Sequence, residues 1–409
     1  MPSPSTGSDA GAPPSRAVAD QRRSPWVQLK TFSYHPTLYP AMIRGASPDA
    51  KAGDLVHIYD KDGNPFGAGL YHPRARVPVR VLHHGIEPYT EDDFVAAIDR
   101  AIDLRLQVLG VAEHTDAFRV VHSDGDSLSG LIIDRFGDVL SISVHSLGMA
   151  RRLPRWLPHL HSRLGTKRVV LEVDERAARL EGISPKVIPT DAVRSVKIRE
   201  NGIRYEVDFE QGHKTGFFCD QRDNRRRLAS FTAGKRVLDL CCYTGGFSLS
   251  AKTQGQAADV TGVDLDETAI EQAKRNANLN QARIQWIHCD AFTWSRQMQK
   301  NAERWDVVVL DPPKLVFDRE DTDGGIKKYE DLNILALSLV KPGGIFVTCS
   351  CSGMVDEAEF ERIVVKAAHR QSKRLQFLDR TGASADHPVQ SNCPESRYLK
   401  VFWARVVGA

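Results

Sequence analysis

The second half of the chain, beginning after Gly234, alternates short apolar runs with amphipathic stretches. The apolar runs lie at 237–240, 260–263, 284–287, 305–310 and 344–348. Each run has the length of a buried strand, and residues 266–278 place Ile270, Ala273 and Ala277 on one face of a helix. Strands that alternate with helices are typical of a parallel, doubly wound α/β sheet. Two late runs, at 375–378 and 398–404, predict an antiparallel pair that closes this sheet.

The first half of the chain begins with a β-rich stretch and continues with a mixed one. Residues 26–86 contain short strands separated by turns, such as 55–59 and 77–82, and predict a small β-barrel-type module. A helical stripe follows at Phe94, Ala97, Ile98, Ala101, Leu104 and Val108. Strands at 118–121, 131–133 and 139–144 then predict a β-meander. A helix at 151–164 and a strand at 168–173 complete an α+β segment.

Composition narrows the class of protein without specifying a partner. The 409 residues are 41% hydrophobic and 26% charged, and the net charge is +3. No apolar run approaches the roughly 20 residues that a membrane span requires. A charge so close to neutral permits a nucleic-acid partner only through local clusters of basic residues.

The cysteines and the N-terminal stretch indicate where the protein works. Seven cysteines, among them the adjacent Cys241 and Cys242, form no disulfide-like framework and fit a reducing, cytoplasmic compartment. The stretch from Met1 to Arg23 is rich in Ser, Pro, Ala and Gly and lacks the apolar centre of a signal peptide. The expected division is a disordered tail at 1–25, the β module at 26–86, the α+β segment at 87–200 and the α/β domain at 201–409.

Three acidic residues, Asp239, Asp264 and Asp290, stand at the ends of three consecutive predicted strands. Ligands of such sheets bind outside the carboxyl ends of the strands. After the first strand, Gly245 and Gly246 let the backbone approach a ligand where a helix begins. Asp239 suits a ligand ammonium group, Asp264 suits ribose hydroxyls and Asp290 suits an adenine amine. The expected cofactor is S-adenosylmethionine, although each acid alone could also be a helix N-cap or a loop residue.

The next two predicted strands run into Asp311-Pro-Pro-Lys314 and Thr348-Cys-Ser-Cys-Ser-Gly353. Adjacent prolines fix an extended turn that can hold Asp311 rigidly. C5 of cytosine is a poor nucleophile until a thiolate adds to C6, so its methylation needs a cysteine and an acid that bonds N3 or N4. Cys351 and Asp311 supply these groups, and Cys349 is the second candidate thiol.

Other readings of the cysteines remain open from the residues alone. A cysteine is often a small buried hydrophobic residue, as we expect for Cys241, Cys242 and Cys289. A metal site at Cys349 and Cys351 is not expected, because no nearby His or Cys completes four ligands.

A polar and basic stretch at 212–227 precedes the α/β domain's first strand. Phe217 or Phe218 could stack on a ring, and Gln221 and Arg222 could reach the cofactor or the substrate. The arginines at 225–227 are either charges on a helix surface or contacts to phosphate groups.

Together these motifs resemble those of the bacterial 23S ribosomal RNA 5-methylcytosine methyltransferase I family, over about residues 26–406. The specific matches are Lys214-Thr-Gly-Phe-Phe218, Asp220-Gln-Arg222, Asp239 with Thr244-Gly-Gly-Phe247, Asp311-Pro-Pro-Lys314, Ser350-Cys-Ser-Gly353, Asp386-His-Pro388 and Pro394-Glu-Ser-Arg-Tyr-Leu-Lys400. Residues 51–56 and 67–71 are similar to a PUA domain. The resemblance implies a PUA-like β-barrel, an α+β middle segment and a class I (Rossmann-like) S-adenosylmethionine-dependent methyltransferase domain, in a cytoplasmic protein.

The resemblance also assigns roles to residues. It implies that Cys351 is the nucleophile. Cys349 is the alternative, because other RNA cytosine-C5 methyltransferases place the thiol after a threonine. Those enzymes carry a second cysteine after the two prolines, which Lys314 replaces here as in the resembled family. The expected catalytic residues are Cys351, Asp311 and Cys349. The expected cofactor residues are Asp239, Tyr243, Thr244, Gly245, Gly246, Phe247, Asp264, Asp290, Ala291, Asp311, Gln221 and Arg222.

The chain departs from the family's pattern at His35-Pro-Thr-Leu-Tyr39, where the family more often has His-Pro-Trp, and in its N-terminal tail. The expected partner is 23S ribosomal RNA or a large-subunit precursor, with no membrane, and a homodimer is left open. One alternative is methylation of an exocyclic base amine such as guanine N2, which would place an aromatic residue where Lys314 stands. Another is a non-catalytic RNA-binding protein, against which the intact acids and thiol argue. A small-molecule methyltransferase is disfavoured by the PUA-like module.

Overall fold

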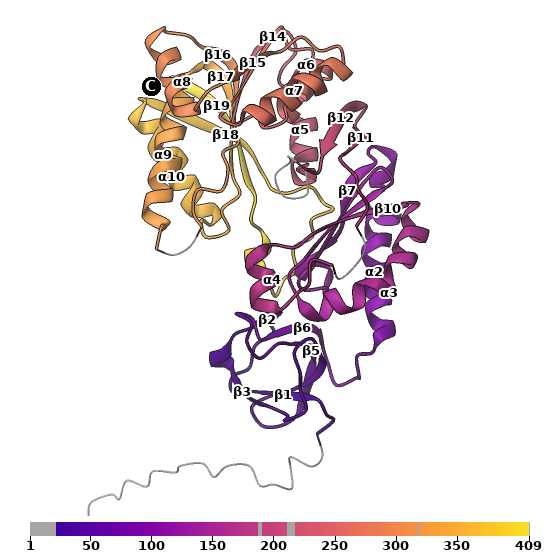
Figure 1. Ribbon diagram of the computed structural model, residues 1–409. Coiled ribbons are helices and arrows are strands. Elements are labelled where there is room, and N and C mark those ends of the chain that lie inside the picture. The colour runs from indigo at the N-terminus through magenta and orange to yellow at the C-terminus, as the bar shows by residue number, and fades with distance from the viewer. Residues whose placement is uncertain (1–21, 187–189, 211–216, 318–319, 409) are drawn as a thin grey trace, which may run out of the picture.

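The computed structural model describes residues 22–186, 190–210, 217–317 and 320–408. Within these residues the strands form sheets of six, four, two and seven strands. Figure 1 shows them arranged along the length of the molecule, with the N-terminal sheet at one end and the seven-stranded sheet at the other. Residues 1–21 of the tail predicted at 1–25, and residues 211–216 of the polar stretch, lie outside the described residues.

The N-terminal β module is a sheet of order β2-β6-β5-β4-β1-β3. Its strands are β1 (Trp26–Leu29), β2 (Thr37–Leu38), β3 (Ile43–Ala46), β4 (Leu55–Tyr59), β5 (Pro65–Tyr71) and β6 (Val79–His84). The strands predicted at 55–59 and 77–82 are confirmed as β4 and β6. Alternating side chains such as Val27, Ile58 and Val81 point inward and form the module's own core.

The middle segment packs helices against a sheet of order β10-β9-β8-β7. Its elements are α2 (Glu91–Asp103), β7 (Ala117–His122), β8 (Leu131–Phe136), β9 (Val139–Val144), α3 (Leu147–Leu164), β10 (Arg168–Glu172) and α4 (Glu175–Glu181). The predicted meander is confirmed, because β7, β8 and β9 pair antiparallel in sequence order. β10 joins β9 in parallel after α3, as a crossover connection requires.

The predicted helical stripe fails in its last turn. α2 gives way to a π-helical turn at Leu104–Val108, which adds a residue to the turn and rotates the following side chains. Val108 is therefore 73% exposed, whereas the Arg105 side chain is fully buried. Arg105 donates to both carboxylate oxygens of Asp126, at 2.5 and 2.9 Å, and to the carbonyl oxygen of Asp386 at 2.7 Å.

The C-terminal part begins with a hairpin, β11 (Ser195–Glu200) and β12 (Ile203–Asp208), and the predicted boundary at residue 200 falls at the end of its first strand. A sheet of order β15-β14-β13-β16-β17-β19-β18 follows. Its strands are β13 (Arg236–Leu240), β14 (Asp259–Asp264), β15 (Gln285–His288), β16 (Trp305–Leu310), β17 (Val340–Ser350), β18 (Lys373–Thr381) and β19 (Lys400–Gly408). The first five are parallel and β19 is antiparallel to both neighbours, which confirms the doubly wound sheet with its closing pair.

Helices cover both faces of the seven-stranded sheet. They are α5 (Arg222–Ala229), α6 (Gly246–Thr253), α7 (Glu267–Leu279), α8 (Ala291–Lys300), α9 (Thr322–Ser338) and α10 (Glu357–Arg370). Figure 1 shows α8, α9 and α10 on one side and α5, α6 and α7 on the other. Each side buries a separate apolar cluster against the strands. Among the described helices, none is both long and apolar enough to cross a membrane.

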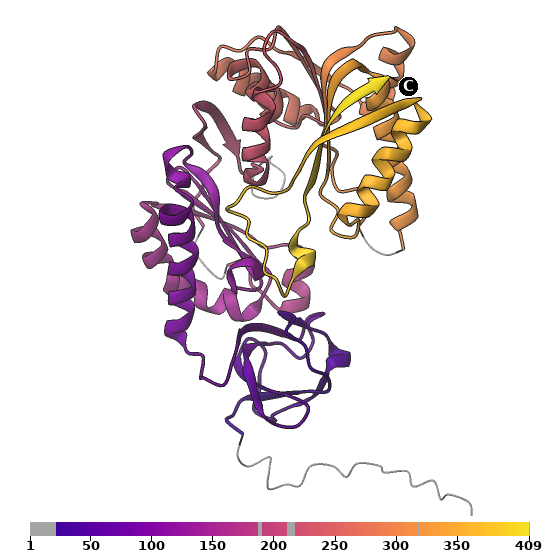
Figure 2. The same cartoon turned by 180° about the vertical axis from the view of Figure 1, so that it is seen from behind.

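A connection between β18 and β19, residues 382–399, runs from the seven-stranded sheet down to the middle segment and the β module (Figure 2). We call it the tail loop. Asp386 accepts a bond from the backbone N–H of Arg119 at 2.9 Å, and Gln390 donates to Ser127 at 2.7 Å. Asn392 donates to the carbonyl oxygen of Tyr34 at 2.8 Å. The loop therefore ties the three parts of the molecule together.

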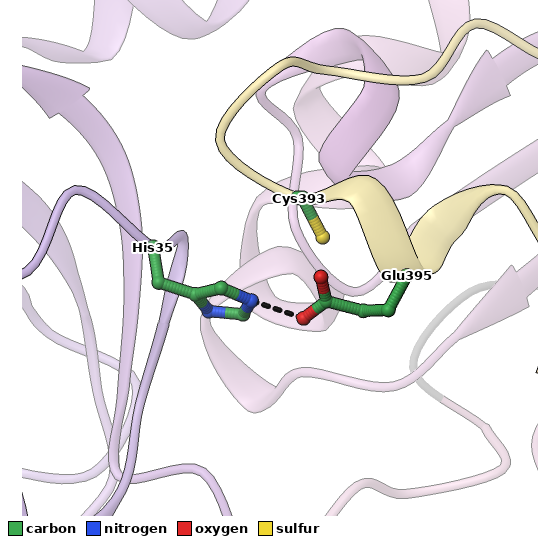
Figure 3. A group of neighbouring side chains, drawn as sticks. All are labelled: His35, Cys393 and Glu395. Carbon is green, nitrogen blue, oxygen red and sulfur yellow. Dashed lines mark hydrogen bonds and ion pairs between the residues drawn. The ribbon is translucent and has the colours of Figure 1, made fainter. Parts of the chain in front are cut away.

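Figure 3 shows the end of the tail loop, where Glu395 bonds Nε2 of His35 and Cys393 lies beside them. Their ligand-type atoms lie within 4.8 Å of one another. Burial raises the pKa of the Cys393 thiol to about 11. The imidazole is already engaged by the carboxylate, so we interpret the group as a link between the β module and the tail loop.

Candidate active site

The candidate catalytic residues lie at one edge of the seven-stranded sheet. Leu240 on β13 pairs with Leu310 on β16, and Leu310 pairs with Thr348 on β17, all in parallel. After β13 and after β16 the chain turns toward opposite sides of the sheet. The carboxyl ends of these two strands therefore form the switch point, where ligands of doubly wound folds bind. The structure thus places Asp311 directly after β16 and Cys351 directly after the adjacent strand β17.

Asp239 is a fully buried carboxyl group near the end of β13. Its Oδ2 accepts hydrogen bonds from the backbone N–H of Ser248 at 2.9 Å and from the Ser248 hydroxyl at 2.7 Å. Its Oδ1 is buried with no hydrogen-bond partner. Burial raises the pKa of Asp239 to about 7. An unsatisfied buried carboxylate oxygen is costly, and an ammonium group of a ligand would satisfy it.

The loop after β13 is held in an unusual backbone conformation. Cys241 and Tyr243 adopt φ values of 61° and 48°, which residues with a side chain rarely do. Asp264 at the end of β14 fixes the loop, because its Oδ2 accepts from the backbone N–H of Tyr243 at 2.7 Å. Its Oδ1 accepts from the N–H of Asp266 at 2.9 Å, so the predicted ribose-binding acid also organises the turns around it. Strained backbone of this kind concentrates at ligand sites.

The two glycines of this loop make room for protein side chains. Gly245 has φ +83°, and a Cβ there would lie 2.5 Å from the ring of Trp286. A Cβ on Gly246 would lie 2.8 Å from Cδ of Arg225. Their expected role, to let the backbone approach a ligand, stays a prediction. Thr244 and Phe247, on either side, are largely buried.

Asp290 has the role of a helix N-cap. Its Oδ1 accepts from the backbone N–H and from the hydroxyl of Thr293, both at 2.9 Å, at the start of α8. Ala291, the first residue of α8, is buried in the adjoining apolar cluster. The structural role left open by the sequence is thus present, and the expected bond of Asp290 to an adenine amine stays a prediction.

Asp311 is enclosed by Gln221 and Cys349. Its Oδ2 accepts from the Gln221 amide at 3.1 Å, and the Cys349 thiol interacts with the same carboxyl group. Burial, reinforced by the nearby Asp220, raises the pKa of Asp311 to about 7. Near neutral pH the carboxyl group can therefore either donate or accept a proton.

The two candidate thiols differ in their surroundings. Cys349 is fully buried, and burial raises the pKa of its thiol well above the usual range. Cys351 is partly exposed, beyond the end of β17. Its turn is held by Ser352, whose Oγ lies 2.9 Å from the Tyr329 hydroxyl and accepts from the N–H of Val316 at 3.2 Å. Cys351 is therefore the accessible thiol on a fixed turn.

Some residues of the polar stretch before α5 contact the loop after β13, and others form buried contacts or ion pairs. The Phe218 ring lies 5.1 Å from that of Tyr243, whereas Phe217 is buried against Tyr205. Arg222 forms a bidentate pair with Asp386, at 3.0 and 2.8 Å, so its guanidinium fastens the tail loop to α5. Its assignment to the cofactor stays a prediction.

Arg225 is neither a charge on a helix surface nor an exposed phosphate contact, the two roles predicted for the arginines at 225–227. Its guanidinium is buried, forms two 2.7 Å bonds with the Glu200 carboxylate and lies 4.7 Å from the centroid of Phe217. The charge thereby joins α5 to the β11–β12 hairpin. Arg227 pairs with Asp379 at 2.7 Å, and Arg226 is exposed.

Comparison with known proteins places this site in a family. A family model of S-adenosylmethionine-dependent methyltransferases matches residues 176–398, and a PUA-like domain model matches residues 21–84. The ribosomal RNA large subunit methyltransferase I of Photobacterium profundum is 32% identical over 388 residues, which cover 93% of this chain and 95% of the relative. A ribosomal RNA large subunit methyltransferase of Deinococcus radiodurans is 34% identical over 397 residues, with 94% and 97% covered. The chain belongs to the ribosomal RNA large subunit methyltransferase I family.

A solved structure supports the fold of this member of the large subunit methyltransferase I family. SMU.776 in complex with SAH aligns with a TM-score of 0.76 at 21% identity, over 91% of this chain and 96% of that chain. The protein is an S-adenosylmethionine-dependent methyltransferase, and the residues at the switch point fit that cofactor. The unpartnered Oδ1 of Asp239 is the observation that fits best, because the methionine part of the cofactor carries an ammonium group.

Sequence reasoning missed several residues of this methyltransferase site. Ser248 and Asp386 act through bonds to Asp239 and Arg222, and ordinary polar residues in a helix or loop give no signal of such partners. Lys400 is 3% exposed and donates to the carbonyl oxygen of Ser352 at 2.7 Å. A lysine that begins an otherwise apolar strand was a signal that could have identified it.

Proposed function

We propose that this methyltransferase acts on C5 of a cytosine in large-subunit ribosomal RNA, through a transient bond between Cys351 and C6 of the base. The observation that carries the proposal is the arrangement of an accessible thiol and an acid with a raised pKa at the ends of β17 and β16. Methylation of an exocyclic amine requires no thiol at the end of the strand next to such an acid. The class of RNA follows from the relatives, which are ribosomal RNA large subunit methyltransferases.

Each residue at the strand ends has a distinct part in this chemistry. Asp239, Asp264 and Asp290 would hold S-adenosylmethionine, which supplies an electrophilic methyl group when bound. The Cys351 thiolate adds to C6, forming a carbon–sulfur bond and moving electron density to C5. Once C5 carries the methyl group, loss of the C5 proton to a base lets the carbon–sulfur bond break. The electron pair returns to sulfur and the thiolate is regenerated.

Asp311 is suited to assist the addition step. Because its pKa is raised to about 7, a large share of the carboxyl groups carry a proton near neutral pH. A protonated Asp311 can donate to N3 of the cytosine and stabilise the charge that builds on the ring as sulfur adds to C6. Gln221 keeps the carboxyl group oriented through its 3.1 Å bond to Oδ2.

Cys349 fits a supporting role better than the nucleophilic one. It is fully buried, its thiol interacts with Asp311, and burial raises its pKa well above the usual range, so it has little tendency to form a thiolate. Cys351 is exposed enough to meet a base entering the edge of the sheet. We therefore assign the covalent bond to Cys351 and the orientation of Asp311 to Cys349.

We infer that the β module at 26–86 binds the RNA and that residues 201–409 carry out the methyl transfer, in the cytoplasm. The segment at 87–200 connects these two parts. The β module presents Phe32 and Tyr34, which are 59% and 56% exposed and whose ring centroids lie 4.7 Å apart. Exposed aromatic rings are the surfaces on which unpaired bases stack. Tyr34 also contacts the tail loop through Asn392, which places these rings beside a segment anchored at α5.

The test compares Cys351→Ser with Cys349→Ser. Transfer of a labelled methyl group to unmodified large-subunit ribosomal RNA is measured, and the product nucleoside is identified by mass spectrometry. We expect 5-methylcytidine from the unaltered protein, a loss of at least about a thousandfold in Cys351→Ser, and retention of most activity in Cys349→Ser. A Cys351→Ser protein that still methylates, or a product methylated on an exocyclic amine, would refute the proposal.

A further inference from the structure

Lys400 is a buried cation at the start of β19, next to the turn that carries Cys351. It is 3% exposed, and the strand continues through the buried residues Val401, Phe402 and Trp403. β19 pairs antiparallel with β17, with Lys400 opposite Ser350. The residue after Ser350 is Cys351, so strand pairing fixes the lysine beside the candidate nucleophile.

The contacts of the Lys400 ammonium group are to neutral oxygens. Its Nζ donates to the carbonyl oxygen of Ser352 at 2.7 Å and to that of Tyr398 at 2.8 Å. In the described part of the chain, no carboxylate forms an ion pair with it. An ammonium group has three donors, and two are used here. A buried cation without a paired carboxylate favours a negative charge nearby.

Tyr329 on α9, Cys349 on β17 and Lys400 on β19 are among the groups whose charges interact with the Cys351 thiol. Of these three groups, Lys400 is the one that carries a positive charge. Burial lowers the pKa of Lys400 to about 8, while Cys351 and the acids Asp356 and Glu357 at the start of α10 act to raise it. The lysine is thus mainly protonated at pH 7, and its attraction to the sulfur acts in both directions.

We propose that Lys400 is a positioning residue that stabilises the Cys351 thiolate and holds its turn, so that the nucleophile is ionised near neutral pH. The thiol proton passes to solvent and the electron pair stays on sulfur, where it is available for addition to C6. This proposal rests on the proposed function only in naming Cys351 as the nucleophile, because ionisation of the thiol can be measured without RNA.

The test measures the alkylation rate of Cys351 by iodoacetamide against pH, with the modified peptide quantified by mass spectrometry. Lys400→Gln keeps hydrogen-bond donors and removes the charge, whereas Lys400→Arg keeps the charge. We expect the midpoint for Cys351 to rise by about one pH unit or more in Lys400→Gln, which is about a tenfold slower alkylation at pH 7, and to rise less in Lys400→Arg. Cys393, whose pKa is raised to about 11, serves as a second thiol in the same sample.

A purely structural role for Lys400 would change the melting temperature without moving the midpoint. Superimposable profiles for the unaltered protein and Lys400→Gln would overturn the proposal. Should Lys400→Gln fail to fold, the unaltered protein decides, because a Cys351 midpoint at or above about 8.5 would show no stabilised thiolate. A shifted midpoint combined with an active Cys351→Ser protein would refute the proposed function while leaving the pairing of Lys400 with the thiol intact.

Discussion

At the scale of single residues, three acids at the ends of strands differ in their burial and in their hydrogen-bond partners. Asp239, Asp264 and Asp290 each follow or end a strand, yet Asp264 and Asp290 bond nearby backbone N–H groups while Asp239 keeps one buried oxygen unpartnered. Burial raises the pKa of Asp239 to about 7. Its carboxyl group is therefore protonated below pH 7 in the folded protein and must ionise to receive a ligand ammonium group.

This ionisation predicts that binding of S-adenosylhomocysteine strengthens as pH rises. From pH 6 to pH 8 the affinity should increase roughly tenfold, because below a pKa of about 7 each pH unit reduces the carboxylate fraction up to tenfold. Calorimetry in two buffers of different ionisation enthalpy should also detect proton release at pH 6. Asp239→Asn should bind weakly with no pH dependence over this range, and pH-independent binding by the unaltered protein would contradict the role given to Asp239.

At the scale of elements, much of the fold follows from the sequence, because buried strands are continuous apolar runs and the acids at their ends are visible. The strands of the seven-stranded sheet were predicted in this way, and so was the placement of Asp311 and Cys351 at one edge. The π-helical turn after α2 was not predicted. The apolar residues keep a helical spacing as far as Val108, so the extra residue leaves no mark on the sequence pattern.

Partners that lie far apart in sequence were equally out of reach. Arg222 meets Asp386, 164 residues away, and Arg225 meets Glu200 on a hairpin that sequence patterning did not predict. Both arginines stand in a basic stretch that looks like a surface charge cluster. Only the packing of α5 against the hairpin and the tail loop shows that they are buried.

The pair formed by Arg225 and Glu200 predicts a large effect on stability. Their side chains are 6% and 2% exposed, so Glu200→Gln would leave a buried guanidinium without its charge partner. We expect the free energy of unfolding to fall by about 3–5 kcal/mol, measured by denaturant titration. Glu271→Gln, which breaks the exposed pair with Lys274, is the matched control and should change little. Equal stability of the two variants would show that the pair does not hold α5 to the hairpin.

At the scale of the whole molecule, the tail loop connects the β module to the seven-stranded sheet. It bonds the middle segment through Asp386 and Gln390 and the β module through Asn392 and Glu395 (Figure 2). The end of this loop, Tyr398, leads directly into Lys400 beside the Cys351 turn. One continuous segment thus links the β module, where we propose that the RNA binds, to the strand beside Cys351.

Exposed rings on the β module predict where the RNA is bound. Replacing Phe32 and Tyr34 together by alanine should weaken binding of large-subunit ribosomal RNA roughly tenfold or more, because stacking contributes about 1–3 kcal/mol per base. Binding of S-adenosylhomocysteine should be unchanged. Leu378→Ala, which removes a side chain 46% exposed on the edge strand β18, is the control and should bind RNA normally. Unaltered RNA affinity in the double variant, measured by filter binding, would place the RNA elsewhere.

Trapping a covalent adduct between Cys351 and the cytosine tests the proposed chemistry most directly. Large-subunit ribosomal RNA transcribed with 5-fluorocytidine cannot lose a proton from C5, so a thiol that has added to C6 stays bonded after methyl transfer. The protein is incubated with this RNA and S-adenosylmethionine, digested, and searched by mass spectrometry for a peptide joined to a nucleotide. We predict an adduct on Cys351, present in Cys349→Ser and absent from Cys351→Ser. An adduct on Cys349, or none on a protein that methylates the unmodified RNA, would contradict the account.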